Sequence, residues 1–120
     1  VGMNEAAARA AGRAFRVLRW PFAENDRAQA ERATEGLIKA IVTPRGAILG
    51  AGIVGRAAGE LVQPWALAIG AGLKIGALAG MTVAYPTLGE VNKRAAGAFF
   101  TPKLTGEGVK KLVKFLSWFG

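Results

Sequence analysis

A tyrosine hydroxyl and a nearby carboxylate are the side chains of this sequence best placed for proton chemistry. Tyr85 and Glu90 lie in the stretch Tyr-Pro-Thr-Leu-Gly-Glu at 85–90. Pro86 biases Tyr85 toward extended geometry, and Thr87 followed three residues later by Glu90 matches a helix capping box. A tyrosine with a pKa of about 10 can donate a hydrogen bond or a proton but is a poor base at neutral pH. Capping alone would account for Glu90, and packing on a sheet would account for Tyr85, so a structural role stays open beside the chemical one.

The composition excludes several other kinds of chemistry. The chain has no cysteine, which rules out disulphides and thiol redox chemistry in this piece, and no histidine, the commonest general base and metal ligand. The 8 carboxylates are scattered, so we expect no metal site. The net charge of +8 raises the question of nucleic acid. The basic residues are dispersed, except for Lys110, Lys111 and Lys114, and no recognised nucleic-acid motif is present, so we do not expect nucleic-acid binding.

A glycine run at 50–55 resembles a dinucleotide-binding fingerprint. That fingerprint requires a strand–turn–helix unit and an acidic residue about 20 positions further on. No Asp or Glu lies between Glu60 and Glu90, and the run falls in the second arm of an expected hairpin. We interpret the glycines as sites of close backbone approach. A small NADH-binding enzyme built on this run is a less favoured alternative.

The pattern of apolar residues predicts the elements of the first half of the chain. We expect a capped helix at 4–11, a strand at 15–20 ended by Pro21, and a hairpin of strands 37–42 and 47–54. The hairpin turn at 43–46 has proline and glycine where such a turn favours them. The polar stretch 24–34 fits either a helix or a surface excursion and stays undecided.

In the second half the apolar period becomes helical. Ala58, Leu61, Val62, Trp65 and Ile69 recur at helical spacing, and Pro64 should kink or delay this helix. Stretch 61–85 is apolar enough to suggest a membrane span. Its charged residues and glycines favour instead a buried helix followed by a short one. We then expect a strand at 81–84 and a helix at 88–98 with Val91 and Ala95 inward. This order predicts an α+β fold, an antiparallel sheet with helices packed on it, in one domain.

The tail 106–120 has the pattern of a basic amphipathic helix. Its apolar residues would form one stripe and its three lysines the other. Such a helix can bind an anionic membrane surface or dock on another part of the protein or on a partner. We favour docking, and keep a stand-alone module that binds an anionic membrane as the alternative.

Several segments together resemble one family. Residues 85–90 resemble the His-Pro-Thr-x-x-Glu signature of the pyridine nucleotide-disulphide oxidoreductases, which include dihydrolipoamide dehydrogenase and mercuric reductase, with Tyr85 in place of histidine. Residues 1–6 resemble the family's Val-Gly-x-Thr-Glu segment, and 48–61 its strand-then-helix pair. The resemblance implies that residues 1–120 are a dimerisation domain from a longer flavoprotein, as the start at Val1 also suggests. It implies a homodimer, with FAD and NAD(P)H held by upstream domains and no cofactor in this piece, which should be inactive alone.

The resemblance also implies site roles. By position, Tyr85 takes the proton-transfer place and Glu90 the orienting place at the partner subunit's redox site, and the Tyr85–Pro86 bond is expected to be cis. Tyrosine in place of histidine argues against dithiol exchange and favours a mercuric-reductase-like or quinone-like acceptor, although the paired C-terminal cysteines of mercuric reductases are missing. We expect a cytoplasmic protein, with membrane contact through the tail as the alternative. The expected interface residues are Leu61, Trp65, Ile69, Pro86, Thr87 and Val91.

Overall fold

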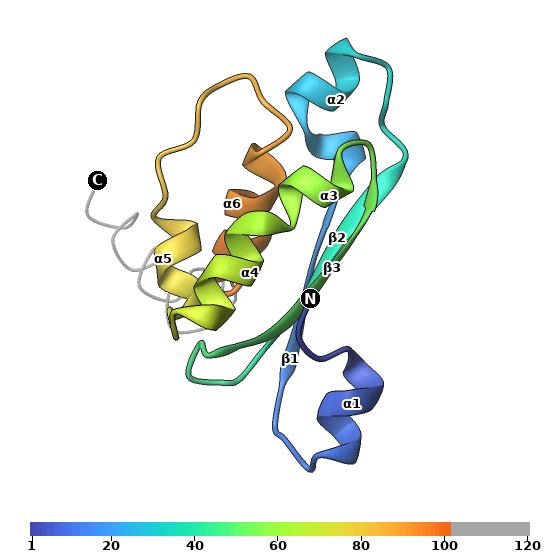
Figure 1. Cartoon of the computed structure of the whole chain (residues 1–120). Coiled ribbons are helices and arrows are strands. Elements are labelled where there is room, and N and C mark those ends of the chain that lie inside the picture. Colours follow the sequence, from blue (N-terminus) through green and yellow to red (C-terminus); the bar gives the residue numbers. More distant parts are fainter. Residues whose placement is uncertain (102–120) are drawn as a thin grey trace, which may run out of the picture.

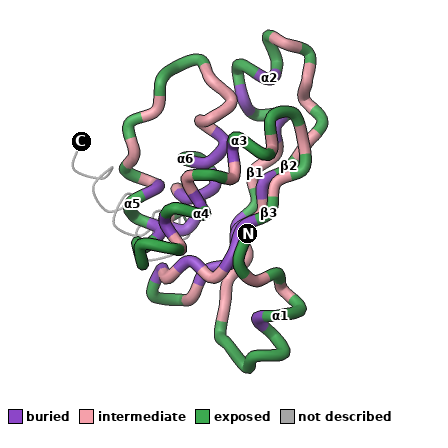
Figure 2. The backbone as a smooth tube through the Cα atoms, viewed as in Figure 1, coloured by how far each residue is buried: buried purple, intermediate pink, exposed green. Residues whose placement is uncertain are grey.

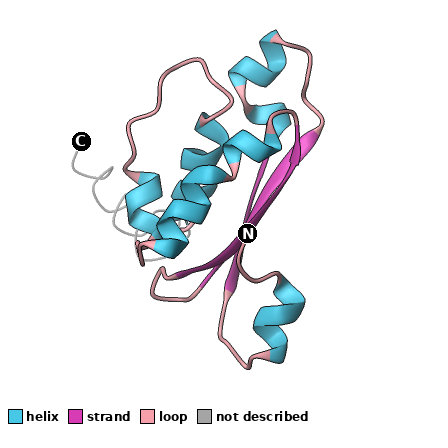
Figure 3. Ribbon diagram, in the orientation of Figure 1, coloured by secondary structure: helices cyan, strands magenta, loops and turns pink. Residues whose placement is uncertain are grey.

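The protein is an α+β fold with one antiparallel sheet, as the sequence predicts. A computed structural model describes residues 1–101. Its three strands, β1 (Arg16–Pro21), β2 (Gly36–Val42) and β3 (Ile48–Gly55), lie in the order β1-β2-β3. Most of the helices gather on one side of this sheet, whereas the first helix lies apart from them (Figures 1 and 3). The tail 106–120 and its lysines lie outside the described residues.

The strands follow from the hairpin pattern in the sequence. β2 and β3 pair antiparallel with Ala40 opposite Ala51, and β1 pairs antiparallel with β2. The connecting turn is closed by the Gly46 amide, which donates to the Thr43 carbonyl at 2.9 Å. The predicted strand at 15–20 and the predicted hairpin are therefore confirmed.

Alternation along the strands separates a core face from an outer face. Ile38 and Ala40 of β2 are buried completely beneath the helices. Leu37 of the same central strand is 37% exposed on the other face. Its cross-strand partner Val54 is 76% exposed. The buried backbone follows the strands and the helices that cover them (Figure 2). Period-two alternation is what a sheet covered mainly on one face requires.

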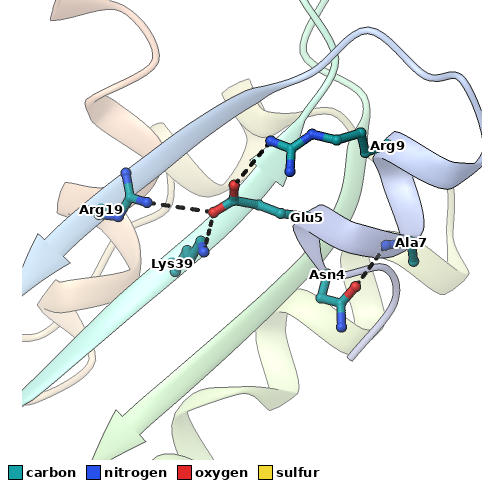
Figure 4. Close-up of polar contacts among 6 residues, drawn as sticks. All are labelled: Asn4, Glu5, Ala7, Arg9, Arg19 and Lys39. Atoms are coloured by element: carbon teal, nitrogen blue, oxygen red, sulfur yellow. Dashed lines mark hydrogen bonds and ion pairs between the residues drawn. The ribbon is translucent and has the colours of Figure 1, made fainter.

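Helix α1 (Glu5–Ala10) is fixed to the outer face by charge. Asn4 caps it by accepting a hydrogen bond from the Ala7 amide at 2.8 Å, as predicted. Glu5 forms ion pairs with Lys39 of β2 and, at 3.5 Å, with Arg19 of β1 (Figure 4). The hydrogen bond from Lys39 and the neighbouring cations hold the pKa of Glu5 below its usual value, against the opposing effect of desolvation.

The chain start lies against β3, where a glycine is required. The Met3 amide donates to the Leu49 carbonyl at 2.8 Å, and Gly2 bridges Gly50. A Cβ atom on Gly50 would lie 1.9 Å from the Met3 carbonyl oxygen, which no side chain can accommodate. This confirms the interpretation of Gly50 as a site of close backbone approach, whereas a Cβ atom on Gly52 would meet no atom within 4 Å.

Stretch 24–34, for which the sequence favours neither a helix nor a surface excursion, is helical in its first half. A short 3-10 turn, η1 (Phe22–Glu24), leads into α2 (Asp26–Ala30), which is capped by Asn25. The helical period after Gly55 gives α3 (Ala58–Leu61) and α4 (Gln63–Gly70), with Pro64 in the first turn of α4. The interruption between α3 and α4 confirms that Pro64 delays the regular helix. α5 (Ile75–Ala79) is the expected second short helix.

Helix α6 (Glu90–Gly97) matches the last predicted helix. Val91 and Ala95 are completely buried, as expected, while Lys93 and Arg94 are exposed. Across residues 1–101, no helix reaches the length and apolar character that a membrane span requires.

Two local predictions are wrong. Residues 81–84 form no strand, because they lie in the connection from α5 to α6 and pair with none of the three strands of the sheet. Thr87 does not cap α6, whose N-cap is Gly89. The Thr87 hydroxyl donates instead to the Ala84 carbonyl at 2.6 Å and closes the preceding turn. No capping box forms, so Glu90 is free of the local role that the sequence offered for it.

Candidate functional site

The predicted site is the connection between α5 and α6, called here the tyrosine loop (residues 84–90). It leaves the helical layer and passes close to α2 before entering α6 (Figure 1). The Tyr85–Pro86 bond is cis, which confirms the prediction. Tyr85 is 68% exposed, so the ring is not packed on the sheet. The loop therefore presents an aromatic hydroxyl at the surface.

The tyrosine loop is held by the first residues of α2. Asn25 is 4% exposed, and its Oδ1 accepts a hydrogen bond from the Ala28 amide at 2.8 Å as the cap of that helix. Its Nδ2 donates to the Thr87 carbonyl at 3.0 Å. One buried side chain therefore both starts α2 and holds the loop. Next to it, the Tyr85 hydroxyl donates to Asp26 Oδ2 at 2.6 Å.

Tyr85 and Glu90 share one small cavity of about 60 Å³. Glu90 is half-buried in its wall, yet the hydroxyl of Tyr85 bonds to Asp26 and not to Glu90. The hydrogen bond and the charge of Asp26 raise the pKa of Tyr85 above 10.0, and desolvation and Glu90 add to the effect. Tyr85 therefore stays a neutral phenol at physiological pH. The residues lining the cavity are Trp20, Glu24, Asn25, Asp26, Tyr85, Glu90 and Arg94.

The sequence did not indicate Asn25 and Asp26 as partners of the tyrosine loop. They lie about sixty positions before it, in stretch 24–34, where the sequence favours neither a helix nor a surface excursion. The available signal was the Asn-Asp pair, since asparagine favours an N-cap and aspartate favours the first turn of a helix. That signal could have located α2, but it could not have shown what the helix end contacts.

The structure divides the expected interface residues into two groups. Trp65 and Val91 have no exposed surface, and Leu61 is 8% exposed, so these three belong to the core of the chain itself. Asn92 links two of them: it accepts a hydrogen bond from the Trp65 indole at 2.8 Å and donates one to the Leu61 carbonyl at 2.9 Å. A side chain without exposed surface cannot contact a partner. Among the expected residues, surface remains on Ile69, Pro86 and Thr87.

The segment that precedes the tyrosine loop in the sequence is nearly uncharged. Residues 61–89 include one charged residue, Lys74. Within them Leu67 of α4 is 71% exposed and Leu73 is 44% exposed. We call the exposed side of α4 and α5 the α4–α5 surface. Its exposed small and apolar residues are Ala66, Leu67, Gly70, Ala71, Leu73, Gly76 and Ala77.

No metal site was found in the part of the chain that the structure describes. Within residues 1–101, no three His, Cys, Asp or Glu side chains come together in a way that could hold an ion.

The described part of the chain is thus a small antiparallel sheet covered by helices, with an exposed cis-proline loop and a nearly uncharged helical surface. The model of the pyridine nucleotide-disulphide oxidoreductase dimerisation domain matches residues 1–96. The chain belongs to this family, and it is the family's dimerisation domain.

Relatives and solved structures agree with this assignment. The chain is 36% identical over 102 residues to dihydrolipoamide dehydrogenase of Chaetomium thermophilum, covering 84% of this chain and 20% of that protein. Its fold is similar to LpdA of Mycobacterium tuberculosis, with a TM-score of 0.74 and 28% identity over 80% of this chain and 21% of the other. It is also similar to the flavoprotein disulfide reductase RclA of Escherichia coli, with a TM-score of 0.77 and 28% identity over 81% and 22%. The chain spans about a fifth of the length of these proteins.

Proposed function

We propose that this chain works as the dimerisation domain of a longer FAD-dependent NAD(P)H oxidoreductase, and that its tyrosine loop completes the redox site of the partner subunit. The main support is that Tyr85 is both exposed and held in place. Its ring is 68% exposed, while Asn25 and Asp26 fix the loop by two hydrogen bonds. A surface side chain that is held in this way is organised for contact with something outside the chain.

The α4–α5 surface is the proposed contact with the second copy, together with Ile69, Pro86 and Thr87. Interface cores are depleted in charged residues, and this surface contains no acid and the single base Lys74. In a two-fold dimer the same surface meets itself, so Leu67 of one copy lies in the same interface as Leu67 of the other. This leaves the outer face of the sheet, with Leu37 and Val54, outside the dimer contact.

The chemistry at the partner's site is proposed to be hydrogen bonding by Tyr85, with Glu90 in the wall beside it. The chain has no histidine to act as a base. A neutral phenol can contact a thiol, a hydroxyl or a quinone-type oxygen without itself needing to ionise. FAD and NAD(P)H would be held by the upstream domains, which also carry the electron transfer.

Mixed dimers of the longer flavoprotein test this proposal. One subunit carries Tyr85→Phe, and the other has an intact Tyr85 but is unable to bind FAD. Each parent dimer should have little NAD(P)H-dependent activity. If Tyr85 serves its partner, mixing should restore about a quarter of the wild-type activity, because random pairing makes half of the dimers mixed and each has one complete site.

The opposite result is as clear. If Tyr85 serves its own subunit, or no site at all, the mixture has no more activity than its components. Full activity of the Tyr85→Phe dimer would also contradict the proposal. Flavin absorbance of each preparation serves as the control that the intact subunits are loaded.

A further inference from the structure

We infer that Asp26 is the positioning residue of Tyr85, and that together they make the tyrosine a fixed, neutral hydrogen-bond acceptor rather than a proton shuttle. The functional part of this inference rests on the proposed role of the tyrosine loop. The contact between the two residues does not, because it lies within one chain.

The geometry selects Asp26 from among the acids near Tyr85. Its Oδ2 lies 2.6 Å from the phenolic oxygen, a short distance that is typical of a hydroxyl bonded to a carboxylate. Glu90 lines the same cavity from α6 but does not take this hydrogen bond. Asp26 follows Asn25, whose side chain holds the same loop at Thr87. Two consecutive residues of α2 therefore fix the loop at two points, through one carbonyl and one hydroxyl.

The charges that face Tyr85 come from three elements. Glu24 of η1, Asp26 of α2, and Glu90 and Arg94 of α6 all line the cavity that Tyr85 shares. Three of these four groups are acids. Loss of the phenolic proton would place a tyrosinate among these carboxylates, with one guanidinium to oppose them. The pKa of Tyr85 is raised accordingly, mainly by Asp26.

This arrangement decides which hydrogen bonds Tyr85 can offer to a partner. A phenol has one O–H donor, and here it is used by Asp26. The lone pairs of the oxygen remain, on a ring that is 68% exposed. Tyr85 is thus prepared to accept a hydrogen bond from a thiol, hydroxyl or amide donor at the partner's site. A role as net proton donor or as base would require an ion that the surrounding acids destabilise.

The contact can be measured directly, because Tyr85 is the only tyrosine in the chain. The ultraviolet absorbance of tyrosinate therefore reports this residue alone. In the 120-residue chain we expect a titration midpoint above that of the same chain unfolded in urea, a comparison that needs no substitution. Asp26→Asn keeps an acceptor oxygen and removes the charge, so its midpoint should fall below that of the wild type. Asp26→Glu should restore part of the difference.

Glu24→Gln is the matched control, since it removes a carboxylate from the same cavity without removing the hydrogen bond. It should change the midpoint less than Asp26→Asn does. Equal midpoints for the folded and unfolded chain, or for the wild type and Asp26→Asn, would overturn the assignment. So would a larger effect of Glu24→Gln.

A second readout separates this inference from the proposed function. In the longer flavoprotein, loss of the phenolic proton breaks the hydrogen bond by which Asp26 positions Tyr85, so activity should fall at the pH where Tyr85 ionises. Asp26→Asn should move that pH downward. An unchanged pH–rate profile together with a shifted tyrosinate midpoint would preserve the contact and refute the functional role. An unshifted midpoint would refute the contact itself, whatever the activity does.

Discussion

Shortening Leu67 to alanine should weaken self-association of this chain without unfolding it. Leu67 lies on the outward side of α4, whose Trp65 and Ala68 face the core, and it is 71% exposed. Full burial of a leucine side chain stabilises by about 2 kcal/mol, so covering the exposed part of Leu67 contributes about 1.5 kcal/mol per copy. Two-fold symmetry includes the residue twice, for about 3 kcal/mol, which corresponds to about a hundredfold rise in the dimer Kd.

Sedimentation equilibrium over a range of protein concentrations measures this Kd. Val54→Ala is the matched control, because Val54 is also apolar and is 76% exposed, but lies on the outer face of the sheet. It should leave the Kd unchanged. Circular dichroism of each variant checks that the fold is intact. If Leu67→Ala has no effect on the Kd, or if Val54→Ala has the same effect, the interface is not the α4–α5 surface.

Three further predictions concern the scaffold that supports the site. Asn92→Ala should lower the free energy of unfolding in urea by about 2–4 kcal/mol, because it leaves the buried Trp65 indole N–H without its acceptor and removes the donor to the Leu61 carbonyl. A loss below about 0.5 kcal/mol would show that this network is unimportant. Gly50→Ala should destabilise the fold by about 1–3 kcal/mol and expose the Met3 amide to hydrogen exchange. Gly52→Ala is the control and should be nearly neutral, because no atom lies within 4 Å of the added Cβ. Equal effects of the two substitutions would contradict the close approach at Gly50. The pKa of Glu5 is lowered in the folded chain, so the native state binds fewer protons than the unfolded state as pH falls below 4.5, and stability is lost through that window. Glu5→Gln should flatten the acid side of the Tm–pH curve, and an unchanged slope would refute a role for the ion pairs.

The sequence predicts those elements whose signals are local. Strands β2 and β3 follow from alternation and from the proline and glycine of their turn, and α1 follows from Asn4 and the alanines after it. The interpretation of Gly50 is also confirmed, because a Cβ atom there would lie 1.9 Å from the Met3 carbonyl oxygen. For these strands and for α1, the residues that carry the signal lie within a few positions of one another.

Features that depend on a contact with a distant segment of the chain could not be predicted from the sequence. Residues 81–84 have strand-like composition, but a strand needs an edge to pair with, and that depends on where the chain has already gone. Thr87 had a local option as a cap and used its hydroxyl for the preceding turn instead. The partner of Tyr85 came from α2, and no spacing rule connects the two segments. The tyrosine loop could therefore be found from the sequence, whereas what holds it could not.

Isotope-edited NMR on a mixture of labelled and unlabelled chains tests the central claim most directly. It detects contacts between copies and assigns them to residues. If the α4–α5 surface joins the two copies, intermolecular contacts come from the methyl groups of Leu67 and Ile69 and from the ring of Pro86. Contacts between copies that come only from Leu37 and Val54 on the outer face of the sheet, or none at concentrations where the chain is dimeric, would contradict it.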